Sequence, residues 1–170
     1  MHQRTTLVSI GLVSEDGREF YAEFTDYDER QVDDWLEEHV LKNLVLFNGF
    51  PPTEQTYTGD KRYVHGKLSA WLSQFDHCEM WSDVLAYDWM LFISLFGTAF
   101  DLPDNVYYIP FDLATLFKVF GVDPDISREE FALSDGTGAM PDPSRWEKHN
   151  ALWDAMIIKS CYLKLVGNRA

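Results

Sequence analysis

Two apolar runs joined by a tight turn determine how this chain must begin to fold. Residues 7–13 are Leu-Val-Ser-Ile-Gly-Leu-Val, and residues 18–24 are Arg-Glu-Phe-Tyr-Ala-Glu-Phe. Their β-branched, aromatic and other apolar residues favour strands. Between them, Glu15-Asp16-Gly17 is a hairpin signal, because Asp-Gly favours the tight turns that join antiparallel strands. The sequence therefore predicts an antiparallel strand pair at this position.

The rest of the chain alternates between helical and strand-like patterns. Helices are predicted where apolar residues recur at helical spacing, and strands where short apolar segments lie between turns. The predicted helices cover residues 31–41, 65–75, 86–97 and 111–121, with a short one starting at Ser127, and the predicted strands cover residues 78–82 and 105–109. Residues 48–60 are rich in Gly, Pro and Thr and are predicted to form a loop. This alternation indicates an α/β fold, a mixed sheet flanked by helices, in one domain covering residues 1–170.

Composition fits one compact domain and excludes some functions. The chain has 170 residues, 46% of them hydrophobic, and a formal net charge of −14. Such acidity excludes a general nucleic-acid-coating protein, which would be basic, but not a nuclease, whose metal ions neutralise the carboxylates of the site. No apolar run approaches a membrane span, and no signal peptide is visible. We expect a cytoplasmic protein in which Cys78 and Cys161 are reduced core residues.

The C-terminal segment combines a long helical pattern with two chemically active residues. Apolar residues recur at helical spacing through residues 149–165, and Gly167 follows as a stop signal. His149 is placed at the start of this helix, and Asp154 about one turn inside it. A carboxylate that holds a metal ion beside an imidazole that accepts a proton is what metal-dependent phosphodiester cleavage requires. The simpler alternative is that a His at a helix N-terminus is a solvated polar residue.

The spacing His-x4-Asp at the head of the last helix resembles the third motif of DEDDh-type 3′–5′ exonucleases, the DnaQ-like group. The second motif of that group is roughly Asn-x3-(Phe/Tyr)-Asp, and residues 83–88 match it with Asp83 in place of the usual Asn. The stretch from Leu7 to Gly167 is similar to the small bacterial and phage exoribonucleases of this group. The resemblance implies a ribonuclease H-like fold and removal of nucleotides from the 3′ ends of single-stranded RNA or DNA. A homodimer is a separate expectation.

The resemblance also implies a role for each candidate residue. His149 would be the general base, and Asp88 and Asp154 would be ligands of a two-metal site holding Mg²⁺ or Mn²⁺. The residues expected to contact substrate are Asp83, Tyr87, Trp89, Arg145 and Lys148. Packing within the helix core is an equal alternative for Trp89, and simple surface charge is an alternative for each of the cations.

One part of the family pattern is missing from residues 1–170. Members of this group take two further ligands from an Asp-x-Glu on a strand that precedes the one matching residues 7–13. Residues 1–6 include no acidic residue, and Glu15 and Asp16 lie at the far end of the hairpin. We therefore expect a sheet without its first strand and an apolar gap beside residues 7–13. This pattern is explained either by a reading frame begun too late or by loss of metal-dependent catalysis.

Three functions remain open at this point. The first is a metal-dependent 3′–5′ exoribonuclease, whose activity is expected to be very low without the first motif. The second is a catalytically silent relative that binds nucleic acid or a protein partner. The third is an unrelated acidic α/β interaction module in which the two motifs are accidental.

Overall fold

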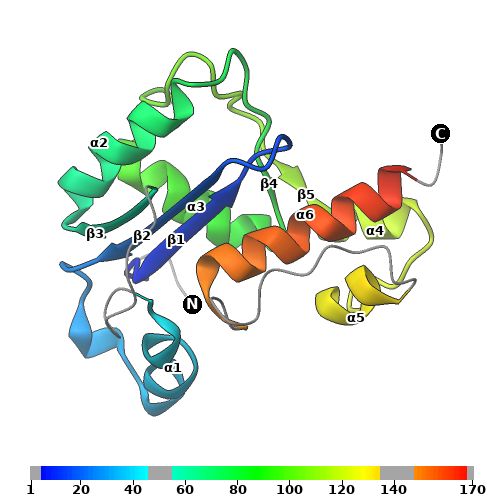
Figure 1. The fold of residues 1–170 in the computed structure, drawn as a ribbon, viewed down its shortest axis with the longest axis horizontal. Helices are drawn as coiled ribbons and strands as arrows, with labels where there is room; N and C mark the ends of the chain where they lie inside the picture. Colours follow the sequence, from blue (N-terminus) through cyan, green and yellow to red (C-terminus); the bar gives the residue numbers. More distant parts are fainter. Residues whose placement is uncertain (1–4, 46–54, 135–147, 168–170) are drawn as a thin grey trace.

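A computed structural model describes residues 5–45, 55–134 and 148–167 as a mixed α/β fold. Five strands form a three-stranded sheet, in the order β1-β2-β3, and a separate two-stranded sheet, β4-β5, with helices around both (Figure 1). The strands are β1 (Ser9–Val13), β2 (Glu19–Phe24), β3 (Thr56–Gly59), β4 (Trp81–Ser82) and β5 (Phe111–Asp112). The predicted fold class, small mixed sheets flanked by helices and consistent with a ribonuclease H-like fold, is confirmed.

The predicted hairpin forms two neighbouring strands of the larger sheet, with β1 at the edge and β2 in the middle. β1 pairs antiparallel with β2, and Leu12 lies opposite Phe20. The turn is closed by a 2.8 Å hydrogen bond from Ser14 N to the Arg18 carbonyl. Gly17 has a φ of 91° there, a conformation that suits glycine because it has no Cβ. On its other edge β2 pairs in parallel with β3.

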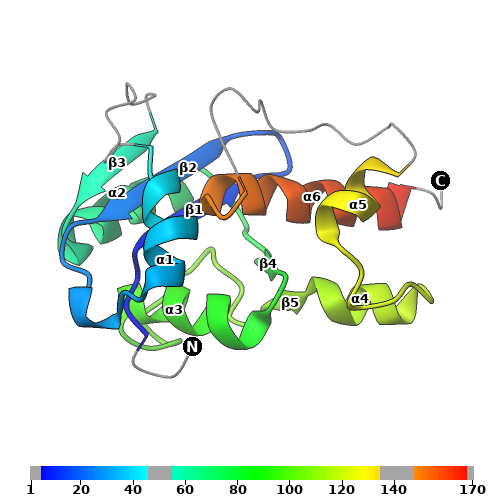
Figure 2. The same ribbon diagram turned by 90° about the horizontal axis from the view of Figure 1, so that it is seen from below.

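Helices cover both faces of this sheet. The α-helices are α1 (Asp34–His39), α2 (Lys61–Leu72), α3 (Leu85–Phe96), α4 (Leu113–Val119), α5 (Arg128–Leu133) and α6 (Ala151–Gly167), and short 3₁₀ helices cover Glu29–Gln31 and Leu41–Asn43. Along β2, Phe20, Ala22 and Phe24 pack into one core with α2 and α3. Tyr21 points the other way, into a second core with α4, α5 and α6. This division follows from the alternation of side chains along a strand, and Figure 2 shows α6 and α3 on separate levels.

The axis of α6 lies very close to β1. A Cβ added to Gly11 would come within 2.4 Å of the backbone carbonyl of Ala151 and of the Leu152 nitrogen. Further along the helix, the Lys159 ammonium donates hydrogen bonds to the carbonyls of Ser14 and Glu15, at 2.7 and 2.9 Å. Gly11 therefore sets how closely the first turn of α6 approaches the sheet.

Several predicted boundaries are wrong for tertiary reasons. Part of the predicted loop at residues 48–60 forms β3, because the polar Thr56–Gly59 segment finds an open edge of β2. The strand predicted at residues 105–109 makes a single bridge, between Val106 and Cys78, and the pairing in β5 begins at Phe111. The helix predicted at residues 31–41 starts later, since Asp33 caps it by accepting a hydrogen bond from the Leu36 N–H. No helix in the described part is long and apolar enough to cross a membrane.

Candidate functional site

A groove separates the two sheets and contains the predicted acidic residues. It has a volume of about 810 Å³ and is lined by β1, by the segment that includes β4, and by parts of α3 and α6. It lies beside residues 7–13, where the sequence predicted an apolar gap. Asp88, in the first turn of α3, and Asp154, in the first turn of α6, both line it.

The surroundings of both carboxylates disfavour their charged forms. The pKa of Asp154 is raised to about 6, mainly by burial and also by the nearby charges of Glu129 and Asp88. The backbone N–H of His149 and the Lys148 ammonium oppose this rise. The Asp88 side chain is exposed to the groove. Its pKa is nevertheless raised, mainly because the surrounding protein removes water from the carboxylate, and also because the charge of Asp83 is close. Two carboxylates with raised pKa values in one groove would both gain from a bound cation.

His149 lies at the start of α6 in an uncommon backbone conformation. Its φ is 68°, a left-handed value rarely adopted by residues other than glycine. Its ring packs edge-on against Trp35, with 5.4 Å between centroids, and lies 6.1 Å from the ring of His39. Burial lowers its pKa, as do the charges of Lys148 and His39. The imidazole is therefore neutral near pH 7 and able to accept a proton.

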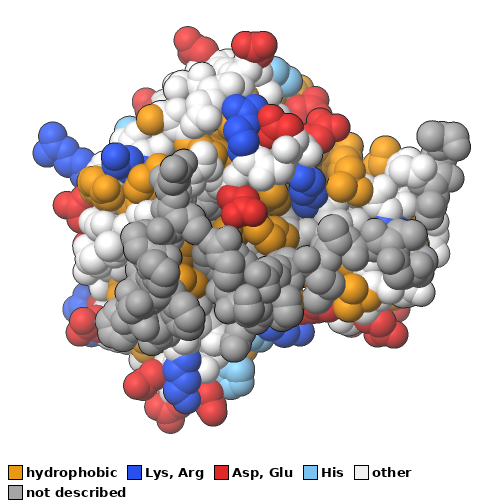
Figure 3. Space-filling view, viewed as in Figure 1, with side chains coloured by type: hydrophobic (Ala, Val, Ile, Leu, Met, Phe, Trp, Pro, Cys, Tyr) orange, Lys and Arg blue, Asp and Glu red, His pale blue; other side chains and the backbone are white. Residues whose placement is uncertain are grey.

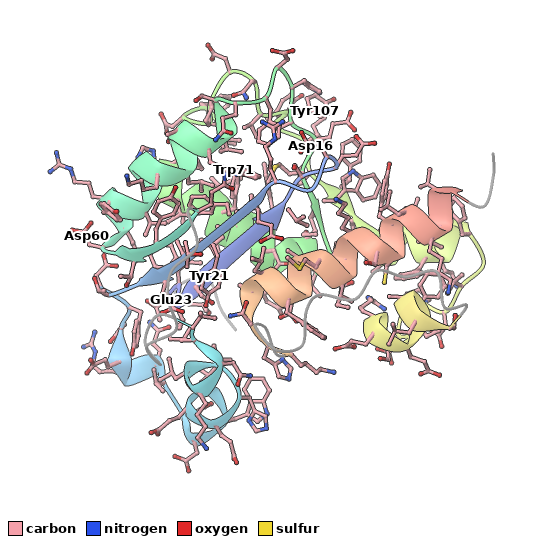
Figure 4. All side chains as sticks on the ribbon, in the orientation of Figure 1. Asp16, Tyr21, Glu23, Asp60, Trp71 and Tyr107 are labelled. Carbon is pink, nitrogen blue, oxygen red and sulfur yellow. The ribbon has the colours of Figure 1, made fainter. Side chains whose placement is uncertain are left out.

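A buried polar network fixes the start of α6 to the middle of the sheet (Figure 4). The Asn150 Oδ1 accepts hydrogen bonds from the N–H groups of Leu152 and Trp153, at 3.0 and 3.4 Å. These two N–H groups of the first turn would otherwise have no partner within the helix. The Asn150 Nδ2 donates to the Tyr21 hydroxyl at 3.0 Å, and that hydroxyl donates to the Glu23 carboxylate at 2.9 Å. Asn150 therefore fixes the position of the first turn of α6 relative to β2. His149 and Asp154, which lie close to Asn150 in the sequence, are positioned with it.

Asp83 has a structural partner. Its Oδ1 lies 2.7 Å from both the Nε and the Nη2 of Arg128. The same guanidinium donates to the carbonyls of Ile126 and Pro124, at 2.6 and 2.9 Å, and lies over the ring of Phe117. The ion pair joins the N-terminal end of α3 to α5, so in this conformation the Asp83 carboxylate is engaged within the protein.

The other expected substrate contacts differ in their exposure. Tyr87 is 40% exposed beside Asp88, whereas Trp89 is only 9% exposed and stacks on Phe92. The Lys148 ammonium forms an ion pair with Glu129 at 3.0 Å. Arg145 lies outside the described residues. On the face drawn in Figure 3, Lys and Arg side chains are scattered singly and form no continuous basic patch among the described residues.

Sequence reasoning missed three residues near the site. Glu129 influences the pKa values of both Asp154 and His149, while Trp35 and His39 form a stacked pair, 4.8 Å between centroids, beside the His149 ring. The short helix predicted to start at Ser127 is α5, and the Ser127 side chain does cap it. Nothing in the sequence placed α1 or α5 against the start of α6.

The described residues do not form a metal site by themselves. Within residues 5–45, 55–134 and 148–167, no group of three or more His, Cys, Asp or Glu side chains is arranged to hold an ion. Asp88 and Asp154 supply hard oxygen ligands, which Mg²⁺ and Mn²⁺ prefer. Their raised pKa values do not by themselves make a metal site.

Known proteins similar to this chain are named as exoribonucleases. No protein-family model matches the chain. Two proteins, from two strains of Mycobacterium tuberculosis and each named 3′–5′ exoribonuclease, are similar to it. Each is 33% identical over 152 residues, which cover 88% of this chain and 77% of the relative.

Proposed function

Because the chain belongs to the family of these mycobacterial 3′–5′ exoribonucleases, we propose that it hydrolyses single-stranded RNA from the 3′ end with a divalent metal ion, by DEDDh-type chemistry. The observation that carries the proposal is that Asp88 and Asp154, from helices more than 60 positions apart in the sequence, line one groove, and that the backbone N–H of His149 contacts Asp154. Action on DNA, a homodimer and a cytoplasmic location remain predictions.

The two carboxylates are the proposed metal ligands. Their raised pKa values support this role, because a bound cation would compensate both burial and mutual repulsion. A bound Mg²⁺ or Mn²⁺ supplies Lewis-acid stabilisation of charge on the phosphate oxygens. The chain itself contributes the position of the ligands, because Asn150 and Gly11 hold the first turn of α6 against the sheet.

His149 is the proposed general base. Its lowered pKa keeps the imidazole neutral, and its ring contacts with Trp35 and His39 limit its orientation. Tyr87 is exposed enough to stack on a terminal base. Trp89, Asp83 and Lys148 require a local rearrangement to contact RNA, because each has a packing or ion-pair partner inside the protein.

A catalytically silent relative is the second candidate, and it is favoured by one observation. The described part has no group of three or more possible metal ligands, and two carboxylates alone would not readily fix a pair of ions. We therefore expect residues 1–170 alone to degrade RNA very slowly, and we expect a supplied strand carrying Asp-x-Glu to increase the rate.

The experiment follows the shortening of a 5′-labelled single-stranded RNA with Mn²⁺ or Mg²⁺. Slow 3′-end shortening that stops with EDTA and is abolished by Asp154→Asn would support the proposal, with the exposed Glu38→Gln as the matched control. Degradation that is unchanged in excess EDTA would reject a metal-dependent mechanism. No degradation with any metal, but saturable RNA binding, would favour the silent relative.

A further inference from the structure

The first two turns of α2 contain three cations that have no ion-pair partner among the described residues. Lys61, Arg62 and Lys67 all lie in this helix, the first two exposed and the third half-buried. Four other cations in the described part do form ion pairs, namely Arg18, Arg30, Arg128 and Lys148. The three charges on α2 are therefore available to an anion from outside the protein.

Two carboxylates at the start of α2 accept hydrogen bonds from its main chain. The Asp60 carboxylate accepts from the Tyr63 N–H at 2.8 Å, and the Asp26 carboxylate accepts from the Lys61 N–H at 3.2 Å. Such caps take up N–H groups at the helix start. Recognition of an anion here would therefore use the side chains of the three cations rather than the helix terminus.

Arg62 and Lys67 flank an open basin on the outer face of α2. The basin has a volume of about 500 Å³, and its lining residues are Asp60, Arg62, Tyr63, Gly66, Lys67 and Ala70. With about 3.6 residues per turn, Gly66 and Ala70 lie between Arg62 and Lys67 around the helix. These two small residues form the floor of the depression, which we call the α2 basin.

Gly66 is not required by the packing or the backbone of α2. An added Cβ would have no atom within 4 Å, and the φ of Gly66 is not in the positive range that favours glycine. Glycine inside a helix is destabilising relative to alanine. The effect of Gly66 is to leave bare main chain at the floor of the basin, where a ligand can approach closely.

The Tyr63 ring lies beside the cations and is 46% exposed. A Cβ added to Gly59 would come within 2.6 Å of its Cδ1, so the ring lies against the main chain at the end of β3. The Lys67 ammonium is 5.4 Å from the ring centroids of both Tyr57 and Tyr63. Proteins that bind single-stranded nucleic acids combine such rings, which stack on bases, with cations that contact the backbone.

From these observations we propose that the α2 basin binds single-stranded RNA upstream of the 3′ end, an inference that rests on the exoribonuclease activity proposed above. Arg62 and Lys67 contact phosphates, and Tyr63 stacks on a base. A chain with a net charge of −14 repels RNA at long range, so binding a strand depends on local cations of this kind. An acidic protein segment fits less well, because it would match the cations but offer no planar base to Tyr63.

The basin and the groove lie on different sides of α2. Val64 and Leu68 direct the inner face of the helix to the core, and Trp71 lines the groove. Asp60 and Trp71, labelled in Figure 4, mark the two ends of α2 and are roughly 16 Å apart along its axis, at about 1.5 Å per residue. An RNA whose 3′ end lies in the groove must pass around the helix to reach the basin, so a trinucleotide cannot occupy both.

The test measures RNA binding separately from RNA degradation. The full 170-residue chain is titrated in EDTA into fluorescein-labelled oligouridylates, one of about 12 nucleotides, within the range that one single-strand binding site covers, and one trinucleotide. We expect saturable binding of the longer strand and much weaker binding of the trinucleotide. Three phosphate contacts predict that affinity for the longer strand falls about 20-fold between about 50 and 200 mM salt.

Three variants locate the contact. Arg62→Glu should weaken binding of the longer strand about tenfold and make its salt dependence shallower, because a phosphate contact is lost. Lys118→Glu makes the same change in charge at an exposed lysine of α4 and should have little effect. Gly66→Gln places a side chain on the floor of the basin, so it should weaken binding while raising the melting temperature, because glutamine is the better helix residue.

Equal effects of Arg62→Glu and Lys118→Glu would overturn the proposal, as would unchanged binding by Gly66→Gln or equal affinity for the two RNAs. Competition by polyglutamate as strong as by RNA would assign the basin to an acidic protein and would also overturn it. If Mn²⁺-dependent shortening occurs but Arg62→Glu binds RNA as the unchanged protein does, only the role of the basin is rejected. If Arg62→Glu weakens binding but no metal supports degradation, the basin is supported and the exoribonuclease activity is rejected.

Discussion

Replacing Gly11 with alanine should move the first turn of α6 and lower stability by about 3 kcal/mol. The new Cβ would stand 2.4 Å from three backbone atoms of Ala151 and Leu152. Backbone cannot rotate away as a side chain can, so the helix must shift. Inserting one methyl group into a well-packed contact costs about 1–3 kcal/mol, and a backbone contact this short places the cost at the upper end. For a chain of this size, that corresponds to a melting temperature lowered by roughly 6–12 °C.

Gly66→Ala is the matched control for this prediction. Gly66 lies in α2, is exposed, and has no atom within 4 Å of an added Cβ. The same substitution there should stabilise the protein by about 0.5–1 kcal/mol, because alanine is the better helix residue. Urea unfolding and thermal melting of both variants would measure the two changes. If Gly11→Ala unfolds at the same urea concentration as the unchanged protein, the close contact between β1 and α6 described above is wrong.

Three further predictions concern the site. Because the pKa of Asp154 is raised, the metal-free folded protein holds a proton that the unfolded chain releases between about pH 4 and 6. The free energy of unfolding should therefore fall as the pH rises through this range. Asp154→Asn should remove this decrease when melting is measured as a function of pH. His149→Ala should lower turnover by roughly 10²–10⁴-fold and leave metal affinity, measured by calorimetry, nearly intact; an equal loss of metal affinity would make His149 a ligand. Arg128→Ala should lower the free energy of unfolding by about 1.5–3 kcal/mol, because it leaves the partly buried Asp83 unpaired. Arg30→Ala removes a largely exposed ion pair and should lower it by less than about 1 kcal/mol. Equal urea midpoints for these two variants would contradict the structural role of Asp83.

Local sequence signals predicted the elements whose stabilising contacts are nearby in the chain. The hairpin turn at Gly17, the cap at Ser127 and the long C-terminal helix were all evident from short patterns. The second and third family motifs likewise placed Asp88 and Asp154 near one another, and the groove contains both.

Features that depend on distant partners were not predictable in this way. The segment of β3 is polar and rich in Thr, and it becomes a strand only because β2 offers an edge. Asp83 matched a motif position, but its partner Arg128 is 45 residues away and gave no local signal. The contact of α1 with His149 was hidden for the same reason, since Trp35 and His39 resemble ordinary residues of a surface helix.

The network of Asn150, Tyr21 and Glu23 has a consequence for protein synthesis. Asn150 and Tyr21 are separated by 129 positions in the sequence, and their contact fixes the start of the helix that carries Asp154. During translation the hairpin leaves the ribosome long before α6, which at about 5–20 residues per second follows many seconds later. The nascent chain therefore cannot form the site that contains Asp154 until the ribosome has translated the codons for α6. A chain with the proposed exoribonuclease activity therefore could not attack its own transcript until α6 has emerged from the ribosome.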